Sequence, residues 1–227
     1  MTGASWPDPP PWPPEVPPPW RPPPPETPRP APGPPWPVVP TVPMPRPGQQ
    51  DDVFGRLLER RIVLVSGSLG HDVANVATAQ LMLLDATGDE PIDLHLSCPD
   101  GDLDASSAVA DTVDLVGVEV RAWCRGTLGG PALAPLAAAD RRFAHPHCVF
   151  ALKDPTVQLE GRADQLTSLA AAHERQLAGL HSRLARATGQ PLDRVVADMG
   201  RGLILSAEEA ISYGLVEELA RPERPGR

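Results

Sequence analysis

Residues 124–139 have the pattern of a platform for nucleophilic chemistry. A short β-like run over residues 118–123 leads into a glycine turn, and an alanine- and leucine-rich helix follows. A strand, a tight glycine turn and a buried helix form the usual support for a serine nucleophile and its oxyanion hole. The segment itself contains no serine. The pattern therefore predicts the support of a hydrolase site without its usual nucleophile.

Lys153 is the side chain that could act as an unusual base. It is the only lysine in the chain, and a buried lysine can lose its proton and activate a hydroxyl group. Three hydroxyl groups could serve as the nucleophile: Thr127, Ser106 and Ser107. The alternative is an ion pair between Lys153 and a carboxylate such as Asp100 or Asp154. We favour the ion pair, because nothing in the sequence places a hydroxyl, a base and oxyanion donors together.

The histidines and cysteines do not form the pattern of a metal site. His145 and His147 lie two residues apart at the edge of an expected strand, but no third ligand is apparent. Cys98, Cys124 and Cys148 are an odd number at spacings unlike those of a zinc site. We interpret the cysteines as reduced thiols of a cytoplasmic protein, and we expect neither a metal nor a cofactor.

Composition divides the chain into two parts. Of the 32 prolines, 23 lie in residues 1–47, where they exclude helix and sheet interiors and predict a disordered tail. Residues 48–227 are long enough for one domain with a sizeable core. The formal charge of −9 argues against a nucleic-acid partner or an anionic membrane surface. No run of 18 apolar residues predicts a spanning helix, and no signal peptide is expected.

Strands and helices alternate through the first half of the expected domain. Apolar runs over residues 62–65, 92–97 and 118–123 predict strands, and the run over 62–65 is continuous enough to be covered on both faces. Helical periodicity separates these strands. The alternation predicts an α/β domain with right-handed crossovers.

Blocks of residues along the same region resemble the Clp protease proteolytic subunit, a serine peptidase of the crotonase-like superfamily. The blocks are residues 56–61, 74–81, 98–101, 124–139, 142–147, 188–192 and 206–216. Their order and spacing are nearly those of the family. The resemblance implies a spiral of β-α units from which a helix over residues 163–187, the handle, protrudes. It also implies homo- or hetero-heptameric rings of Clp-type subunits and a Clp ATPase as a partner.

The resemblance also implies where a catalytic site should lie, and this chain departs from the family there. The positions of the nucleophilic serine, the histidine and the aspartate fall on Gly130, Lys153 and Gly202. The two oxyanion-donor positions fall on Asp100 and Pro131, and proline has no N–H to donate.

We therefore predict a non-catalytic subunit that acts in the assembly or regulation of a Clp ring. One alternative is an active serine endopeptidase that uses a relocated or shared site. A second alternative is an acyl-binding module of the crotonase-like kind.

Overall fold

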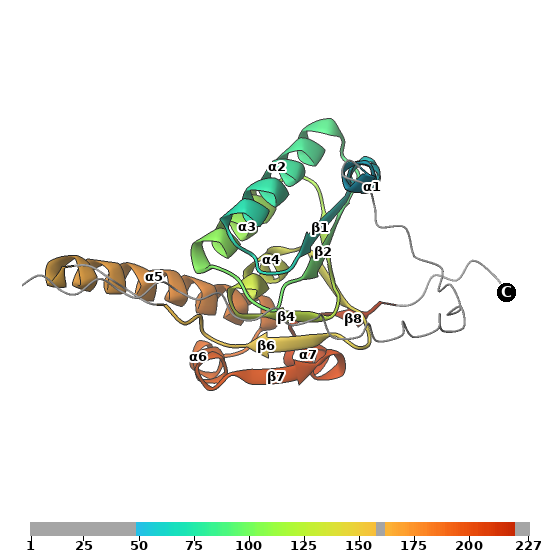
Figure 1. The fold of residues 1–227 in the computed structure, drawn as a ribbon. Coiled ribbons are helices and arrows are strands. Elements are labelled where there is room, and N and C mark those ends of the chain that lie inside the picture. Colours follow the sequence, from blue (N-terminus) through green and yellow to red (C-terminus); the bar gives the residue numbers. More distant parts are fainter. Residues whose placement is uncertain (1–48, 158–161, 221–227) are drawn as a thin grey trace, which may run out of the picture. The chain divides into compact units, whose positions relative to one another are not determined.

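Two β-sheets organise the chain in the computed structural model, which describes residues 49–157 and 162–220 (Figure 1). The expected tail, residues 1–47, lies outside the described residues. The larger sheet is parallel and has the strand order β1-β2-β3-β5-β8. Its strands are β1 (Ile62–Ser66), β2 (Ile92–Ser97), β3 (Val120–Cys124), β5 (Arg141–Ala144) and β8 (Glu218–Leu219).

The second sheet is smaller and mixed. It consists of β4 (Thr127–Gly129), β6 (Val149–Leu152) and β7 (Leu203–Ser206). Strand β4 runs parallel to β6, and β7 runs antiparallel to β6. The helices are α1 (Gln49–Glu59), α2 (His71–Thr87), α3 (Leu103–Leu115), α4 (Leu133–Ala138), α5 (Ala163–Thr188), α6 (Leu192–Arg201) and α7 (Ala207–Tyr213). These elements confirm the α/β class, with the β-α order expected of the Clp type.

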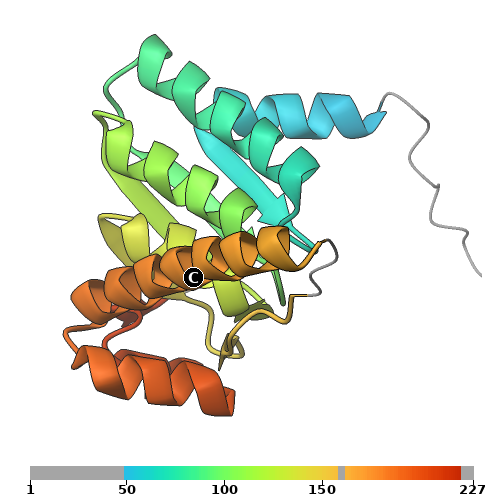
Figure 2. The ribbon, with the colours of Figure 1, turned by 90° about the vertical axis from the view of Figure 1, so that its left-hand side faces the viewer.

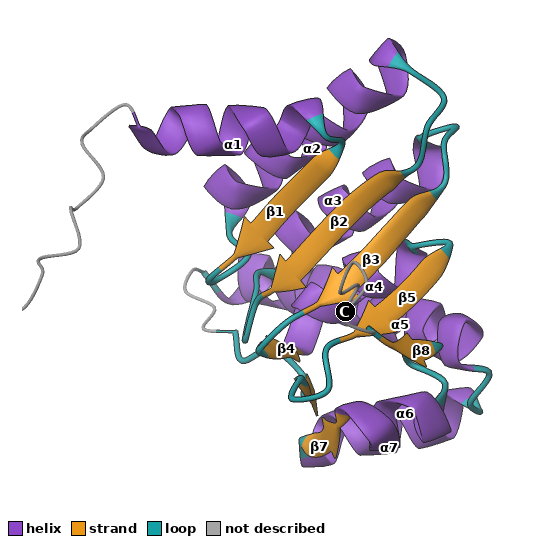
Figure 3. Ribbon diagram, turned by 90° about the vertical axis from the view of Figure 1, so that its right-hand side faces the viewer, coloured by secondary structure: helices purple, strands orange, loops and turns teal. Residues whose placement is uncertain are grey.

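Helices cover one face of the larger sheet, and this arrangement corrects one expectation. Figure 3 shows the strands in front of α2 and α3. In β1, Val63 and Val65 are buried, but Ile62 and Leu64 are only half-buried. The expectation that this strand is covered on both faces was wrong. An apolar run does not reveal that the described residues cover its second face only in part.

The helix after β4 is shorter than its composition suggests. A 3₁₀ turn, Gly130–Ala132, precedes α4, and α4 has six residues. Pro135 lies in the first turn of α4, where the missing proline N–H breaks no intrahelical bond. Proline therefore limits the length of this helix and does not kink it.

Helix α5 confirms the expected long helix and ends one residue later than predicted. Its N-terminal part extends past the neighbouring elements, and its C-terminal part packs against them (Figures 1 and 2). Leu180 and Leu184 are buried, whereas Leu169 is 46% exposed. The apolar stripe along this helix therefore anchors it at the C-terminal end, and at Leu169, nearer the N-terminal end, it is exposed among the described residues.

Helix α7 begins and ends at the predicted signals. The Ser206 hydroxyl accepts a hydrogen bond from the Glu209 amide, and the Glu209 carboxylate accepts one from the Ser206 amide. Gly214 follows the helix with φ +89°. The capping box and the left-handed glycine cap were both readable from the sequence.

Candidate active site

The turn after β4 is held close to the loop formed by residues 98–101. The Gly129 amide donates to the Cys98 carbonyl at 2.9 Å. A Cβ atom on Gly129 would lie only 2.8 Å from the Pro99 carbonyl oxygen. Glycine at this position is therefore required for the two segments to approach, because any side chain would push them apart.

The loop of residues 98–101 is itself anchored to the segment before α2. The Leu69 amide donates to the Asp100 carbonyl, and the Asp102 amide donates to the Leu69 carbonyl, both at 3.0 Å. Leu69 and Gly101 form an isolated bridge. Asp100 is thus fixed on both sides by backbone hydrogen bonds.

Three of the five predicted site positions, Gly130, Asp100 and Lys153, lie close together at this turn. Lys153 Nζ donates to Asp100 Oδ2 at 3.1 Å, and Asp100 Oδ1 accepts from the Gly101 amide at 2.9 Å. A Cβ atom on Gly130 would lie 3.1 Å from Asp100 Oδ1 and 3.5 Å from Lys153 Cε. The space that a side chain of residue 130 would enter is therefore faced by a carboxylate and by the lysine bound to it.

The sheet register brings Gly202 to the same end of the smaller sheet. Ala151 pairs with Ile204, and Leu152 pairs with Leu203. The ladder ends there, and Gly202 is the left-handed cap of α6 just before β7. Gly202 has φ +72°, and a Cβ atom there would meet nothing within 4 Å. The expected position of the aspartate is therefore a turn next to the last strand pair, one residue from Leu203, as Lys153 is from Leu152.

The hydroxyl groups considered as partners of Lys153 are placed for other roles. Ser107 Oγ donates to the Leu103 carbonyl of its own helix at 2.7 Å. Ser106 is fully buried, packs against Gly101, and its Oγ finds no hydrogen-bond partner among the described residues. Thr127 pairs with Val149, four residues before Lys153, which is about 13 Å along an extended strand.

The form of Lys153 also differs from that of a catalytic base. Its side chain is 41% exposed and that of Asp100 is 55% exposed. A serine–lysine dyad needs a desolvated amine, whereas the Lys153 side chain is partly exposed and is bound to a carboxylate. The ion pair that we favoured from the sequence is present.

The family model for Clp protease matches residues 46–223, which is most of the chain. The chain belongs to the Clp protease family. Membership implies a subunit of an oligomeric ring that associates with a Clp ATPase. No helix within residues 49–157 and 162–220 is long and apolar enough to cross a membrane.

The two positions that we expected to supply oxyanion donors are Pro131 and Asp100. Pro131 is buried in the 3₁₀ turn next to Gly130, and it has no amide hydrogen. The other position, Asp100, places its carboxylate beside Gly130. Backbone donors aimed at the developing oxyanion supply much of the rate enhancement in acyl transfer, so a missing donor and an added negative charge both oppose that chemistry.

One polar pair near the site could not be found from the sequence. His181 Nε2 lies 2.8 Å from Asp154 Oδ1, and the His181 side chain is 7% exposed. The Asp154 amide also donates to the Met199 carbonyl. Residue 154 therefore ties the segment after Lys153 to both α5 and α6. His181 lies 27 residues away in a long helix, and no local pattern marks it.

Asp198 belongs to a different network. It is 3% exposed, accepts from the Tyr213 hydroxyl at 2.8 Å, and forms an ion pair with Arg201 at 2.8 Å. Burial and the bond to Asp198 raise the pKa of the Tyr213 hydroxyl. The Asp198 carboxylate is thus bound to Tyr213 and Arg201, which lie on or next to the helices α6 and α7.

The three cysteines are buried, and their surroundings disfavour the reactive thiolate form. Burial raises the pKa of Cys148 to about 11 and raises the pKa values of Cys98 and Cys124 as well. A thiol rather than a thiolate is therefore present at neutral pH, and none of the three is a substitute nucleophile. Within residues 49–157 and 162–220, no three metal-binding side chains converge.

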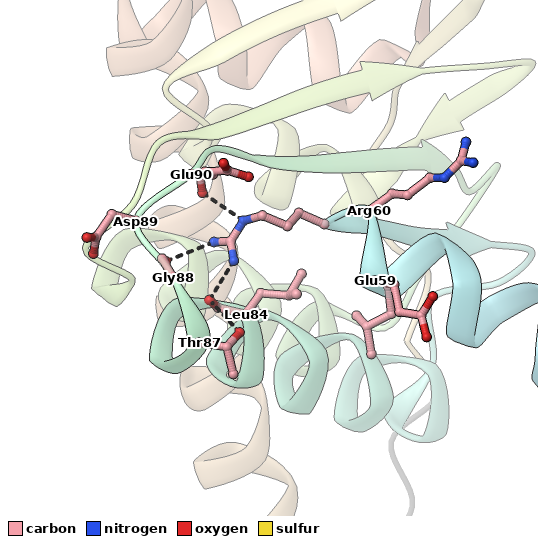
Figure 4. A pocket seen from close by; sticks show the side chains of 9 residues that line it. Glu59, Arg60, Leu84, Thr87, Gly88, Asp89 and Glu90 are labelled. Atoms are coloured by element: carbon pink, nitrogen blue, oxygen red, sulfur yellow. Dashed lines mark hydrogen bonds between the residues drawn. The ribbon is translucent and has the colours of Figure 1, made fainter.

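A cavity of about 710 Å³ lies away from this site, between the end of α1, the turn at residues 60–61, the end of α2 and the loop at residues 88–90 (Figure 4). The Arg61 guanidinium group lies at this cavity and donates to the carbonyl groups of Leu84, Gly88 and Glu90 at 2.9–3.1 Å. Arg61 has φ +59°, so these bonds hold a residue in an uncommon backbone conformation. We interpret this region as a structural anchor for the end of α2.

Proposed function

We propose that this Clp protease homologue is a non-catalytic subunit of a Clp ring and acts in the assembly or regulation of that ring. The observation that carries the proposal is the Asp100–Lys153 ion pair beside Gly130. Hydrolysis by a serine peptidase needs a hydroxyl group, a base and oxyanion donors in one place. Here glycine, a paired lysine and proline stand at those positions, while the supporting strands and helices are kept.

The proposal extends to the ring itself. The open apolar stripe near the N-terminal end of α5 supports assembly, because an isolated monomer would leave it in water. We assign the subunit to a heptameric ring in the cytoplasm, formed with its own copies or with active Clp subunits. Native mass spectrometry of the complex isolated from its own cell tests this assignment. A monomer, or a complex that contains neither further copies of this chain nor another Clp subunit, would contradict it.

Labelling with a fluorophosphonate probe tests the loss of chemistry. We expect no covalent adduct on the purified chain at any serine or threonine. We also expect none for Gly130→Ser, since triad members act as a unit and a lone hydroxyl group gains little. A catalytically active Clp subunit serves as the labelling control. Stoichiometric labelling of one residue of the native chain would overturn the proposal.

A relocated or shared peptidase site is the second candidate, and the Lys153 side chain beside Gly130 is the feature that favours it. It predicts peptide hydrolysis that is lost in both Lys153→Ala and Lys153→Arg, because an arginine keeps its proton and cannot act as a base. An acyl-binding module is the third candidate. It predicts saturable binding of an acyl-coenzyme A, which calorimetry with the whole chain would detect.

A further inference from the structure

Among residues 49–157 and 162–220, no strand pairs with the outer edge of strand β1. β1 is the first strand of the five-stranded sheet, and its partner there is β2 (Figure 3). The carbonyl of Arg61 and the amide of Gly67 bond to β2 at the two ends of the strand. Because alternate residues of a parallel strand bond to the same neighbour, Leu64 and Ser66 turn their N–H and C=O groups away from β2. The structure records no hydrogen bond from residues 49–157 or 162–220 to these outward groups.

An apolar cavity lies beside this open edge. It has a volume of about 610 Å³ and is formed by α1, β1 and α2. Phe54, Leu58, Leu64 and Val76 are among its lining residues. Phe54 is 46% exposed and Val76 is 59% exposed, so large apolar side chains face solvent next to unpaired backbone groups.

Asp72 places a carboxylate in the lining of this cavity. It lies in the first turn of α2 and lines the same cavity. The salt bridges that the structure records within residues 49–157 and 162–220 do not include its carboxylate. A ligand that places a cation near Asp72 would therefore gain an interaction that the protein itself does not satisfy.

We propose that the β1 edge binds an extended peptide of a partner protein by strand addition. The peptide backbone pairs with the outward groups of Leu64 and Ser66, an apolar side chain enters the cavity, and a neighbouring lysine or arginine faces Asp72. Only an extended chain repeats its donors and acceptors at the spacing of a strand edge. The open edge is short, which suits a peptide of a few residues. This surface is separate from the altered site at Gly130.

Fluorescence anisotropy with a designed probe tests the proposal on the full chain. The probe is a fluorescein-labelled nonapeptide of alternating threonine and valine with a central leucine followed by lysine. We expect saturable binding, and binding at least tenfold weaker when alternate amides of the probe are N-methylated. This comparison uses only the native protein, so it stands even if a variant fails to fold.

Two substitutions at the edge complete the test. Ser66→Pro removes one outward donor without touching the β1–β2 bonds, and we expect at least tenfold weaker binding, whereas Ser66→Ala binds as the native chain does. Asp72→Asn should weaken binding a few-fold at low salt only. The proposal is overturned if the native chain does not bind, if N-methylation has no effect, or if Ser66→Pro binds normally with an unchanged melting curve. A dimer that Ser66→Pro dissociates, without peptide binding, would assign the edge to a second copy instead.

Discussion

Two aspartates near the smaller sheet have opposite environments. Asp198 is buried and bound to Tyr213 and Arg201, whereas Asp100 is about half exposed and bound to Lys153. A buried carboxylate must be paired, because leaving it without partners costs several kcal/mol. An exposed ion pair contributes about 0–1 kcal/mol.

The two aspartates therefore differ in role: the contacts of Asp198 stabilise the fold, whereas those of Asp100 lie at the predicted site. The network of Asp198 connects α6 to α7 and belongs to the support of the domain. The pair of Asp100 and Lys153 joins two loops at the place where a peptidase would do its chemistry. If the site is no longer catalytic, substitutions there should be mild and substitutions in the support should be severe.

The largest effect is expected at Asp198. Asp198→Ala removes the acceptor of a buried tyrosine hydroxyl and a partner of Arg201, and we expect the free energy of unfolding to fall by about 4 kcal/mol. Urea unfolding followed by circular dichroism measures it. Asp198→Asn, which keeps the size and one acceptor, should lose about half as much. A loss below about 1 kcal/mol for Asp198→Ala would remove the contrast between the two aspartates.

Gly214 provides the next test of the support. It has φ +89°, and a Cβ atom there would collide with the Thr188 carbonyl oxygen. An alanine here would be strained in the left-handed backbone conformation, and its Cβ atom would force neighbouring atoms to move. We therefore expect the free energy of unfolding of Gly214→Ala to fall by about 3 kcal/mol. The midpoint of urea unfolding would report this loss. A variant as stable as the native chain would mean that the junction of α5 and α7 is not rigid.

Gly202 is the matched glycine at the site. It is also left-handed, but a Cβ atom there would meet nothing within 4 Å. Gly202→Ala should therefore be only about 1 kcal/mol less stable, from backbone strain alone. The same unfolding assay, run beside Gly214→Ala, measures the difference. Equal losses for the two variants would show that space around these glycines does not decide their effect.

The smallest effect is expected for the exposed ion pair. Asp100→Asn and Lys153→Met should each change the free energy of unfolding by less than about 1 kcal/mol, and the change should shrink in 1 M salt. A double-mutant cycle measures the coupling between the two residues. A salt-independent coupling of several kcal/mol would show that the pair holds the site together instead of merely filling it.

The sequence determined the class of the fold and supports the prediction that the expected catalytic positions have lost their reactive groups. Periodicity gave the parallel strands and the long helix α5, because burial imposes a spacing of apolar residues that survives in the sequence. The capping box at Ser206 and the glycine at 214 marked helix α7, because these signals are local. Gly130 and Pro131 could be identified as altered from residue type alone, since glycine has no side chain and proline has no amide hydrogen.

Only the tertiary structure decided which groups meet. Asp100 and Lys153 are 53 residues apart, and Asp154 and His181 are 27 residues apart, so no local pattern links either pair. The continuous apolar run of β1 also concealed that one of its faces and its outer edge are open. Contacts of this kind form when long-range packing brings separate loops and sheets together. The spacing of residues along the chain does not show which loops will meet.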